Sequence, residues 1–141
     1  MSQLSAFLHP VTVQEEKEVI VSKRFQDEKG NPVPFKIRAI TQEENEKLRK
    51  AATRVSKVNG QRVETFDPGN YSARTVVAGT VVPNFSSKEM CDAYGTLDPL
   101  MVPGKMLLSG EYAKLSSAIL ELSGFDDSPE GEAAIEEAVK N

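Results

Sequence analysis

The chain has 141 residues, 39% of them hydrophobic, and a net charge of −4, which fits one domain with a core of its own. With no Trp and only 6 Phe and 3 Tyr, that core must be mainly aliphatic. The acidic balance argues against wrapping nucleic acid, the lone cysteine excludes an internal disulfide, and no apolar run is long enough to predict a membrane span.

Residues 1–16 are predicted to form a mobile N-terminal arm. Leu4, Phe7 and Leu8 could share half a helical turn, and Pro10 would end any such helix. One interpretation is a strand-like tail that docks locally or frays, and the other is a short docking element for a partner protein. The arm lacks the basic start and apolar run of a signal peptide, so we expect a cytoplasmic protein.

Residues 17–40 are predicted to form a β-hairpin, because apolar and polar side chains alternate along two runs. The apolar positions are Val19, Val21 and Phe25 in the first run and Val33, Phe35, Ile37 and Ala39 in the second. A turn-forming stretch, 26–32, separates the runs. Pro32 and Pro34 cannot donate ladder hydrogen bonds, so the second strand is expected at an edge near its start.

Helical patterns dominate the rest of the chain. Thr41 and Glu44 fit a capping box that opens a helix ending at Asn59-Gly60, followed by a connector over 61–69. Asp67-Pro68 starts a second helix that Pro83 stops. Ser86 and Glu89 fit another capping box, for a short helix that ends at Gly95.

The clearest helical pattern covers about 105–123, with a seam of apolar side chains at Leu108, Tyr112, Leu115, Ile119 and Leu122. The seam is too short for a dimeric coiled coil, so a packed core helix and a partner-binding helix remain the two interpretations. Residues 125–141 are acidic with small apolar side chains, which fits either a frayed tail or a helix that docks on a partner.

Together these patterns predict an α+β fold in which an N-terminal β-hairpin packs on a bundle of about four mainly short helices, with more helix than strand. The expected organisation is an arm over 1–16, a single α+β domain over 17–124 and an acidic C-terminal helix or tail over 125–141.

The residues offer little for catalysis. One His and one Cys, His9 and Cys91, are far apart in sequence, and a Cys/His pair needs a positioned base with an orienting group. Zinc-ligand spacing, a calcium loop and glycine-rich nucleotide motifs are all missing from the sequence. We therefore predict an interaction protein, not an enzyme, with no cofactor and no metal.

A nucleic-acid-binding regulator remains as another interpretation. It would require the basic side chains of the first half to cluster on one face and bind phosphates in a salt-dependent way. The side chains concerned are Lys36, Arg38, Lys47, Arg49, Lys50, Arg54 and Lys57.

The order of segments resembles the XkdN-like family of phage tail assembly chaperones. The resemblance lies in Val33–Ile40 running directly into Thr41–Arg49, in Met106–Leu115 followed by Ile119–Phe125, and in the opening Ser5–Leu8. It covers most of the chain and is weakest over 56–100.

This resemblance implies a cytoplasmic protein of the bacterial host, encoded by a phage or prophage. Such a chaperone binds the tape measure protein, keeps it soluble while the tail tube forms around it, and is absent from the finished virion. The major tail tube protein is a second expected partner, and nucleic acid and membranes are not expected partners. A structural tail or head–tail connector component is the alternative function.

The family also implies a longer, frameshifted form of the chain as a partner. Lys140-Asn141 can be encoded AAA-AAC, which would complete a slippery run of A. The resemblance supplies no fixed binding site. From the sequence itself, the candidate partner-binding residues are Phe7, Leu8, Tyr112, Leu115 and Ile119.

Overall fold

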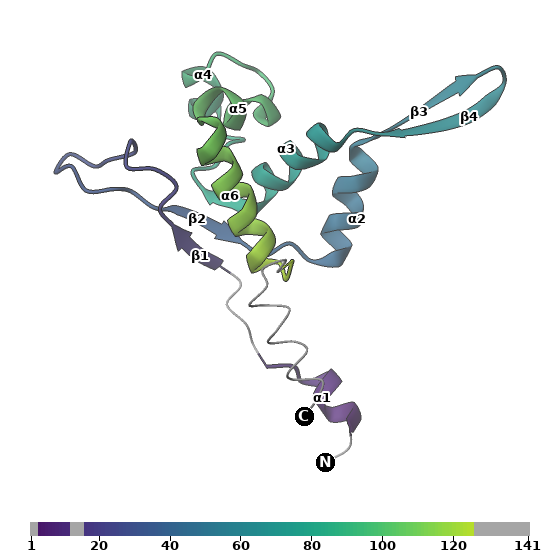
Figure 1. The fold of residues 1–141 in the computed structure, drawn as a ribbon, viewed down its shortest axis with the longest axis horizontal. Helices are drawn as coiled ribbons and strands as arrows, with labels where there is room; N and C mark the ends of the chain where they lie inside the picture. Colours follow the sequence, from purple (N-terminus) through teal and green to yellow (C-terminus); the bar gives the residue numbers. More distant parts are fainter. Residues whose placement is uncertain (1–2, 12–15, 126–141) are drawn as a thin grey trace.

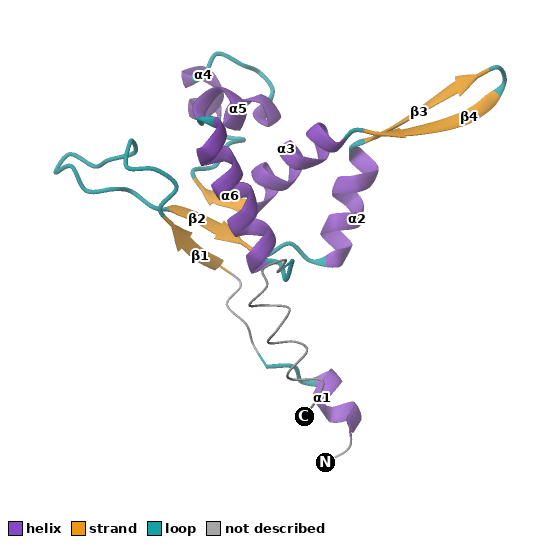
Figure 2. Cartoon of the chain, in the orientation of Figure 1, coloured by secondary structure: helices purple, strands orange, loops and turns teal. Residues whose placement is uncertain are grey.

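The computed structural model describes residues 3–11 and 16–125 (Figure 1). Within these ranges the chain has the predicted α+β class, and helical residues outnumber strand residues (Figure 2). The elements in chain order are α1 (Gln3–Leu8), β1 (Glu16–Val19), β2 (Phe35–Arg38), α2 (Gln42–Ala51), β3 (Thr53–Val58), β4 (Gln61–Phe66), α3 (Pro68–Gly79), β5 (Thr80–Val82), α4 (Lys88–Ala93), a 3₁₀ turn (Pro99–Met101), α5 (Val102–Met106) and α6 (Ser109–Leu122).

The first sheet is antiparallel, with strand order β1-β2-β5. Strands β1 and β2 are shorter than predicted, and β2 lies in the centre, so the prediction of an edge strand is wrong. Pro34 precedes the first residue of β2, so its missing N–H removes no ladder bond. The third strand was missed, because β5 joins the sheet from the end of a helix with only three residues.

The core lies where α6 and α3 cover this sheet. Its fully buried side chains come from all parts of the domain, among them Ile37, Val76, Phe85, Val102, Leu115 and Ile119. Gly79 lets α3 approach α6 closely, because a Cβ at that position would lie 2.6 Å from Cγ2 of Ile119. The core is mainly aliphatic, as the composition predicts.

The predicted helix over 41–58 is wrong beyond Ala51. Thr41 does cap α2, since its hydroxyl accepts a hydrogen bond from the Glu44 amide at 3.2 Å. Residues 53–66, however, form the β3–β4 hairpin. The turn residues Asn59 and Gly60 both have positive φ, 52° and 78°, which is the geometry of a tight two-residue hairpin turn.

The helix predicted between Asp67 and Pro83 begins as expected, because Asp67 Oδ1 accepts from the Asn70 amide at 3.0 Å. It ends earlier, at Gly79, where the Val- and Thr-rich residues that follow enter the sheet as β5. The short helix α4 is capped by Ser87 instead of Ser86, with the Ser87 hydroxyl accepting from the Met90 amide at 3.3 Å.

The long helix predicted over 105–123 is two helices. Helix α5 ends at Met106, and α6 starts at Ser109 after an extended residue, Leu108. Glu111 stabilises this start, because its Oε1 accepts a hydrogen bond from the Leu108 amide at 2.8 Å. Except for Phe125, the predicted acidic segment 125–141 lies outside the described residues, and the three-part division of the chain stays a prediction.

Candidate protein-interaction site

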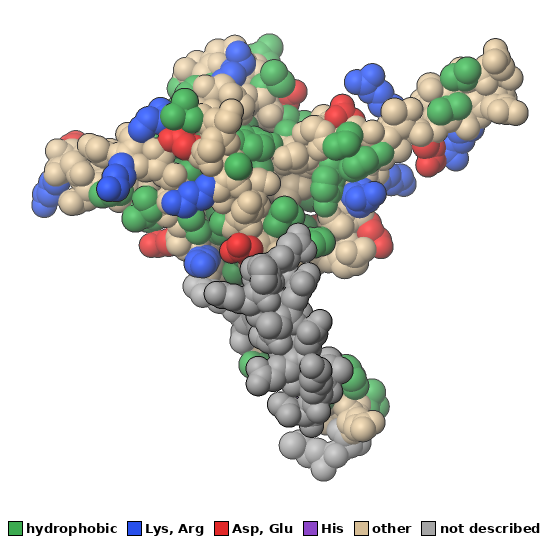
Figure 3. Space-filling model, viewed as in Figure 1, with side chains coloured by type: hydrophobic (Ala, Val, Ile, Leu, Met, Phe, Trp, Pro, Cys, Tyr) green, Lys and Arg blue, Asp and Glu red, His purple; other side chains and the backbone are tan. Residues whose placement is uncertain are grey.

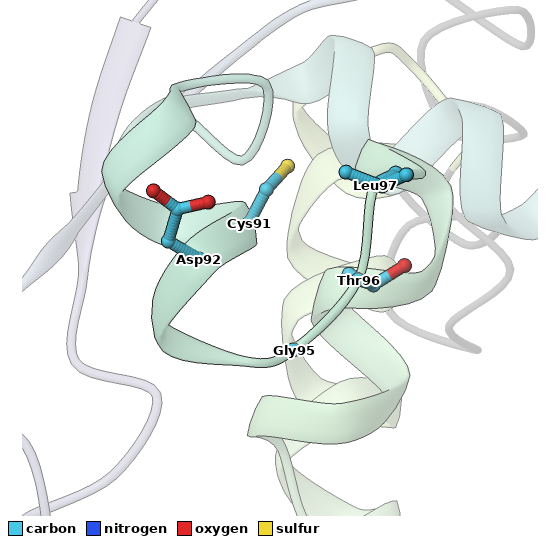
Figure 4. A pocket seen from close by; sticks show the side chains of 5 residues that line it. All are labelled: Cys91, Asp92, Gly95, Thr96 and Leu97. Carbon is cyan, nitrogen blue, oxygen red and sulfur yellow. The ribbon is translucent and has the colours of Figure 1, made fainter.

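Within residues 3–11 and 16–125, no three His, Cys, Asp or Glu side chains come together as a metal site. A hollow of about 260 Å³ is lined by Cys91, Asp92, Gly95, Thr96 and Leu97 (Figure 4). The Cys91 thiol is buried and points to the carbonyl of Phe85 at 3.7 Å, so its contacts are those of a packed side chain.

None of the helices in the described ranges is both long and apolar enough to cross a membrane.

The N-terminal candidates lie on α1, where the arm is helical over six residues. Phe7 is 80% exposed, and Leu4 and Leu8 are also exposed. None of the six residues of α1 is buried, although a six-residue helix is far too short to be stable by itself in water. Phe7 and Leu8 are therefore accessible to a partner.

The candidates on α6 divide into two kinds. Leu115 and Ile119 are fully buried, so neither side chain is available to a partner in this conformation, and the core interpretation applies to both. Tyr112 is half-buried, packs against the core and places its hydroxyl 3.1 Å from the Ser72 hydroxyl. Tyr112 thus differs from Leu115 and Ile119 in being partly accessible. The structure shows no contact between Tyr112 and either Phe7 or Leu8 among the residues it describes.

The β3–β4 hairpin is an exposed surface that the sequence candidates missed. It projects from the body of the protein beyond α2 and α3 (Figure 1). Its six residue pairs keep perfect register from Thr53 opposite Phe66 to Val58 opposite Gln61. Most of its residues are exposed, including Val55 at 56% and Val58 at 53%. The signal was present in the sequence as Asn-Gly between two alternating β-branched runs.

A rigid base holds the hairpin. The Asp67 amide donates to the Ala52 carbonyl at 2.9 Å and closes the two strands where they enter the body. The Arg49 guanidinium lies 4.7 Å from the ring centre of Phe66 and 5.7 Å from that of Tyr71. The Tyr71 hydroxyl in turn donates to Asn45 of α2. Helices α2 and α3 therefore fix the direction in which the hairpin projects.

The basic side chains named as a possible nucleic-acid face are partly neutralised by carboxylates. Lys36 pairs with Glu16 at 3.0 Å, Arg38 with Glu44 at 2.5 Å, and Lys47 approaches Glu43 at 3.8 Å. The bases that remain are at the end of α2 and on the hairpin. On the hairpin, Arg54 and Lys57 lie on opposite faces, so these bases do not form a continuous stripe. Figure 3 shows basic side chains on both sides of the hairpin, with acidic ones beside them.

Two ion pairs hold the body beneath this surface. Arg38 makes a two-pronged contact with Glu44 and also donates to the Ala78 carbonyl at 2.9 Å, which joins β2, α2 and α3. The contact with Arg38 lowers the pKa of Glu44. Likewise, the hydrogen bonds from Arg24, and then from Ser22 and the Leu108 amide, lower the pKa of Glu111 to about 2.

With this geometry established, comparison with known proteins identifies the family. The sequence model described as phage XkdN-like tail assembly chaperone protein matches residues 4–139. The chain belongs to the XkdN-like family of phage tail assembly chaperones. This confirms the resemblance seen in the order of sequence segments.

Individual relatives agree with the family. YqbN of Bacillus subtilis strain 168 is 44% identical over 141 residues, which cover 98% of this chain and 93% of YqbN. The phage-like element PBSX protein XkdN of the same strain is 39% identical over the same shares. The crystal structure of YqbN superposes with a TM-score of 0.72 at 38% identity and covers 89% of this chain and 99% of that one.

Proposed function

We propose that this protein binds a phage tape measure protein and keeps it soluble while the tail tube assembles around it. The observation that carries the proposal is the family match, which extends over residues 4–139 and so includes the arm, the core and the hairpin. The protein acts by binding alone, in the cytoplasm of the bacterial host, and leaves before the tail is complete. Its partners are the tape measure protein, the major tail tube protein and a longer frameshifted form of the chain itself.

The physical requirements of this function support the proposal. A long helical protein with exposed apolar seams aggregates unless those seams are covered. A chaperone for it needs exposed apolar side chains on a charged surface, and needs no catalytic group. This chain exposes Phe7 and Leu8 on α1 and Val55, Val58 and Val63 on the hairpin, in a sequence of which 27% is charged.

Co-expression tests the proposal directly. The tagged protein is co-expressed with the tape measure protein encoded near it, and the soluble fraction is analysed for both. The expected result is a tape measure protein that is soluble only with this chain and co-elutes with it. An insoluble tape measure protein in both cases, together with this chain in purified tails, would instead establish a structural tail or connector component.

The arm offers a sharper prediction. Substitution Phe7→Ala should leave the melting temperature unchanged, since Phe7 is 80% exposed, but should weaken partner binding by about tenfold if Phe7 anchors the contact. Leu97→Ala is the matched control, because Leu97 is 97% exposed at another place on the surface. A loss of several degrees with binding intact would remove Phe7 from the binding residues.

A further inference from the structure

We infer that the β3–β4 hairpin holds the partner, and that one face of the hairpin, together with the end of α2, binds an acidic amphipathic helix. The inference rests on the proposed function and names the surface that performs it. Four observations carry it: an exposed hairpin, a firm base, two adjacent bases on one face and a hollow of suitable lining.

The hairpin is stable only through its attachment. A two-stranded hairpin is marginal in water, and both outer edges of this one have no strand beside them among the described residues. Exposed edges of this kind invite pairing with other chains, and native proteins blunt them with charges. This chain keeps the full register of β3 and β4 and carries Arg54, Lys57 and Arg62 along it. A hairpin that is held in shape but covers no core is therefore already ordered for binding.

The two faces of the hairpin differ. Cross-strand partners share a face, so the register places Thr53 with Phe66, Val55 with Glu64 and Lys57 with Arg62 on one side. The other side carries Arg54 with Thr65, Ser56 with Val63 and Val58 with Gln61. We name the first the seat face and the second the back face.

The seat face carries two of the hairpin's three bases, and their juxtaposition costs stability. Lys57 lies directly opposite Arg62, and like charges in that position repel each other. Glu64 relieves only part of this charge, through its 3.2 Å contact with Arg62. A partner that brings carboxylates to this face can pair with the positive charge that Glu64 leaves, and the two bases are already ordered for that contact.

A hollow of about 350 Å³ lies between the seat face and the end of α2. It is lined by Lys50 from α2 and by Thr53, Val55, Arg62 and Glu64 from the hairpin. The lining thus combines an apolar side chain with two bases and one acid. That combination fits a helix whose apolar stripe contacts Val55 while its flanking carboxylates meet Lys50, Lys57 and Arg62.

The hairpin can be shortened without disturbing its base. Deleting residues 55–58 and 61–64 brings the Asn59-Gly60 turn onto the pair Arg54–Thr65. That pair has the same position in the ladder as Val58–Gln61, because four residues separate the pairs on each strand and the pattern repeats every two. The closing bond between Asp67 and Ala52 is retained. Thermal melting should be unchanged, which shows that the variant folds.

The experiment co-expresses the tape measure protein with the wild type or with variants of the full chain, and measures the tape measure protein in the soluble, co-eluting fraction. The shortened variant and Arg62→Glu on the seat face should each lower this amount about tenfold. Arg54→Glu on the back face should leave it within about twofold. Val55→Thr and Val58→Thr form a second matched pair, since the two valines are 56% and 53% exposed, and only Val55→Thr should weaken binding.

The outcomes separate the inference from the function. If the wild type and the shortened variant hold the tape measure protein equally, the hairpin is not the surface that holds the partner, and the proposed function stands. If Arg54→Glu weakens binding as much as Arg62→Glu, the seat face is wrong. If the wild type itself holds none, the proposed function fails and this surface with it. If deletion of residues 126–141 shifts the hairpin's amide NMR signals while the partner leaves them in place, the occupant is the chain's own acidic segment.

Discussion

The core around α6 and the β3–β4 hairpin use the same kind of side chain in opposite ways. Val76 and Val102 are fully buried, whereas Val55 and Val58 on the hairpin are more than half exposed. In the core, a valine stabilises the fold by leaving water. On the hairpin it favours the extended backbone and leaves its methyl groups accessible. The core therefore determines whether the chain folds, while the hairpin determines what surface the folded chain presents.

The largest difference between these regions should appear on truncating a core side chain. Leu115→Ala removes a fully buried side chain and should lower the free energy of unfolding by about 2–5 kcal/mol. Val58→Thr on the hairpin should change it by less than about 0.5 kcal/mol. Urea denaturation followed by circular dichroism measures both. Equal losses would show that the hairpin contributes to the core.

Adding one methyl group to the closest helix contact should have the next largest effect. In Gly79→Ala the new Cβ meets Ile119, whose branched side chain is fully buried and has little freedom to move, so a loss of about 1–3 kcal/mol is expected. Gly104→Ala is the control, because nothing lies within 4 Å of a Cβ there. If the two variants are equally stable, α3 and α6 are not packed as closely as described.

The Arg24–Glu111 pair should give a smaller, pH-dependent effect. The pKa of Glu111 is lowered from 4.5 to about 2, so its contribution to stability is complete above pH 4.5 and is lost as the pH falls towards 2. The difference in unfolding free energy between the wild type and Glu111→Gln should shrink over that range. Glu121→Gln, at an exposed position of the same helix, is the control. A constant difference would mean that the pair does not contribute through its charge.

The smallest global effect is expected at the hairpin turn. Gly60 has a φ of 78°, so Gly60→Ala should weaken the hairpin locally by about 1 kcal/mol. The melting temperature should not change, but the amide protons of β3 and β4 should exchange faster with solvent. Hydrogen-exchange mass spectrometry can compare these strands with α6. Faster exchange in α6 as well would show that hairpin and core unfold as one unit.

These two regions also differ in how far the sequence predicts them. The 3-4-3 spacing of Tyr112, Leu115, Ile119 and Leu122 correctly identifies a helix that packs on the core, because helical periodicity and burial agree there. Leu108, the first position of the predicted seam, precedes α6 and is exposed. Local patterns failed at β5, whose three residues become a strand only because β2 lies beside them. That pairing is a tertiary contact and leaves no periodicity in so short a segment.

The hairpin was missed for a different reason. The preceding stripe of Leu48, Ala51, Ala52 and Val55 has helical spacing, and it extends by one position into β3. The alternation from Thr53 to Val58 and the Asn59-Gly60 turn compete with that spacing, and the turn geometry prevails. The sequence therefore named only some of the exposed apolar surface: Phe7 and Leu8, whose role in binding stays a prediction, are exposed, whereas the exposed valines of the hairpin were not named.

The position of α6 in the chain has a consequence for synthesis. This helix, the last of those described, supplies Leu115 and Ile119 to a core whose other members include Phe35, Ile37 and Val76. A nascent chain emerges from the ribosome N-terminus first, so those earlier side chains stay uncovered until α6 has been made. The β3–β4 hairpin pairs neighbouring residues, and α2 and α3, which hold its base, also precede α6 in the chain. The surface inferred to hold a partner is therefore synthesised, together with the two helices that support it, before the core has closed.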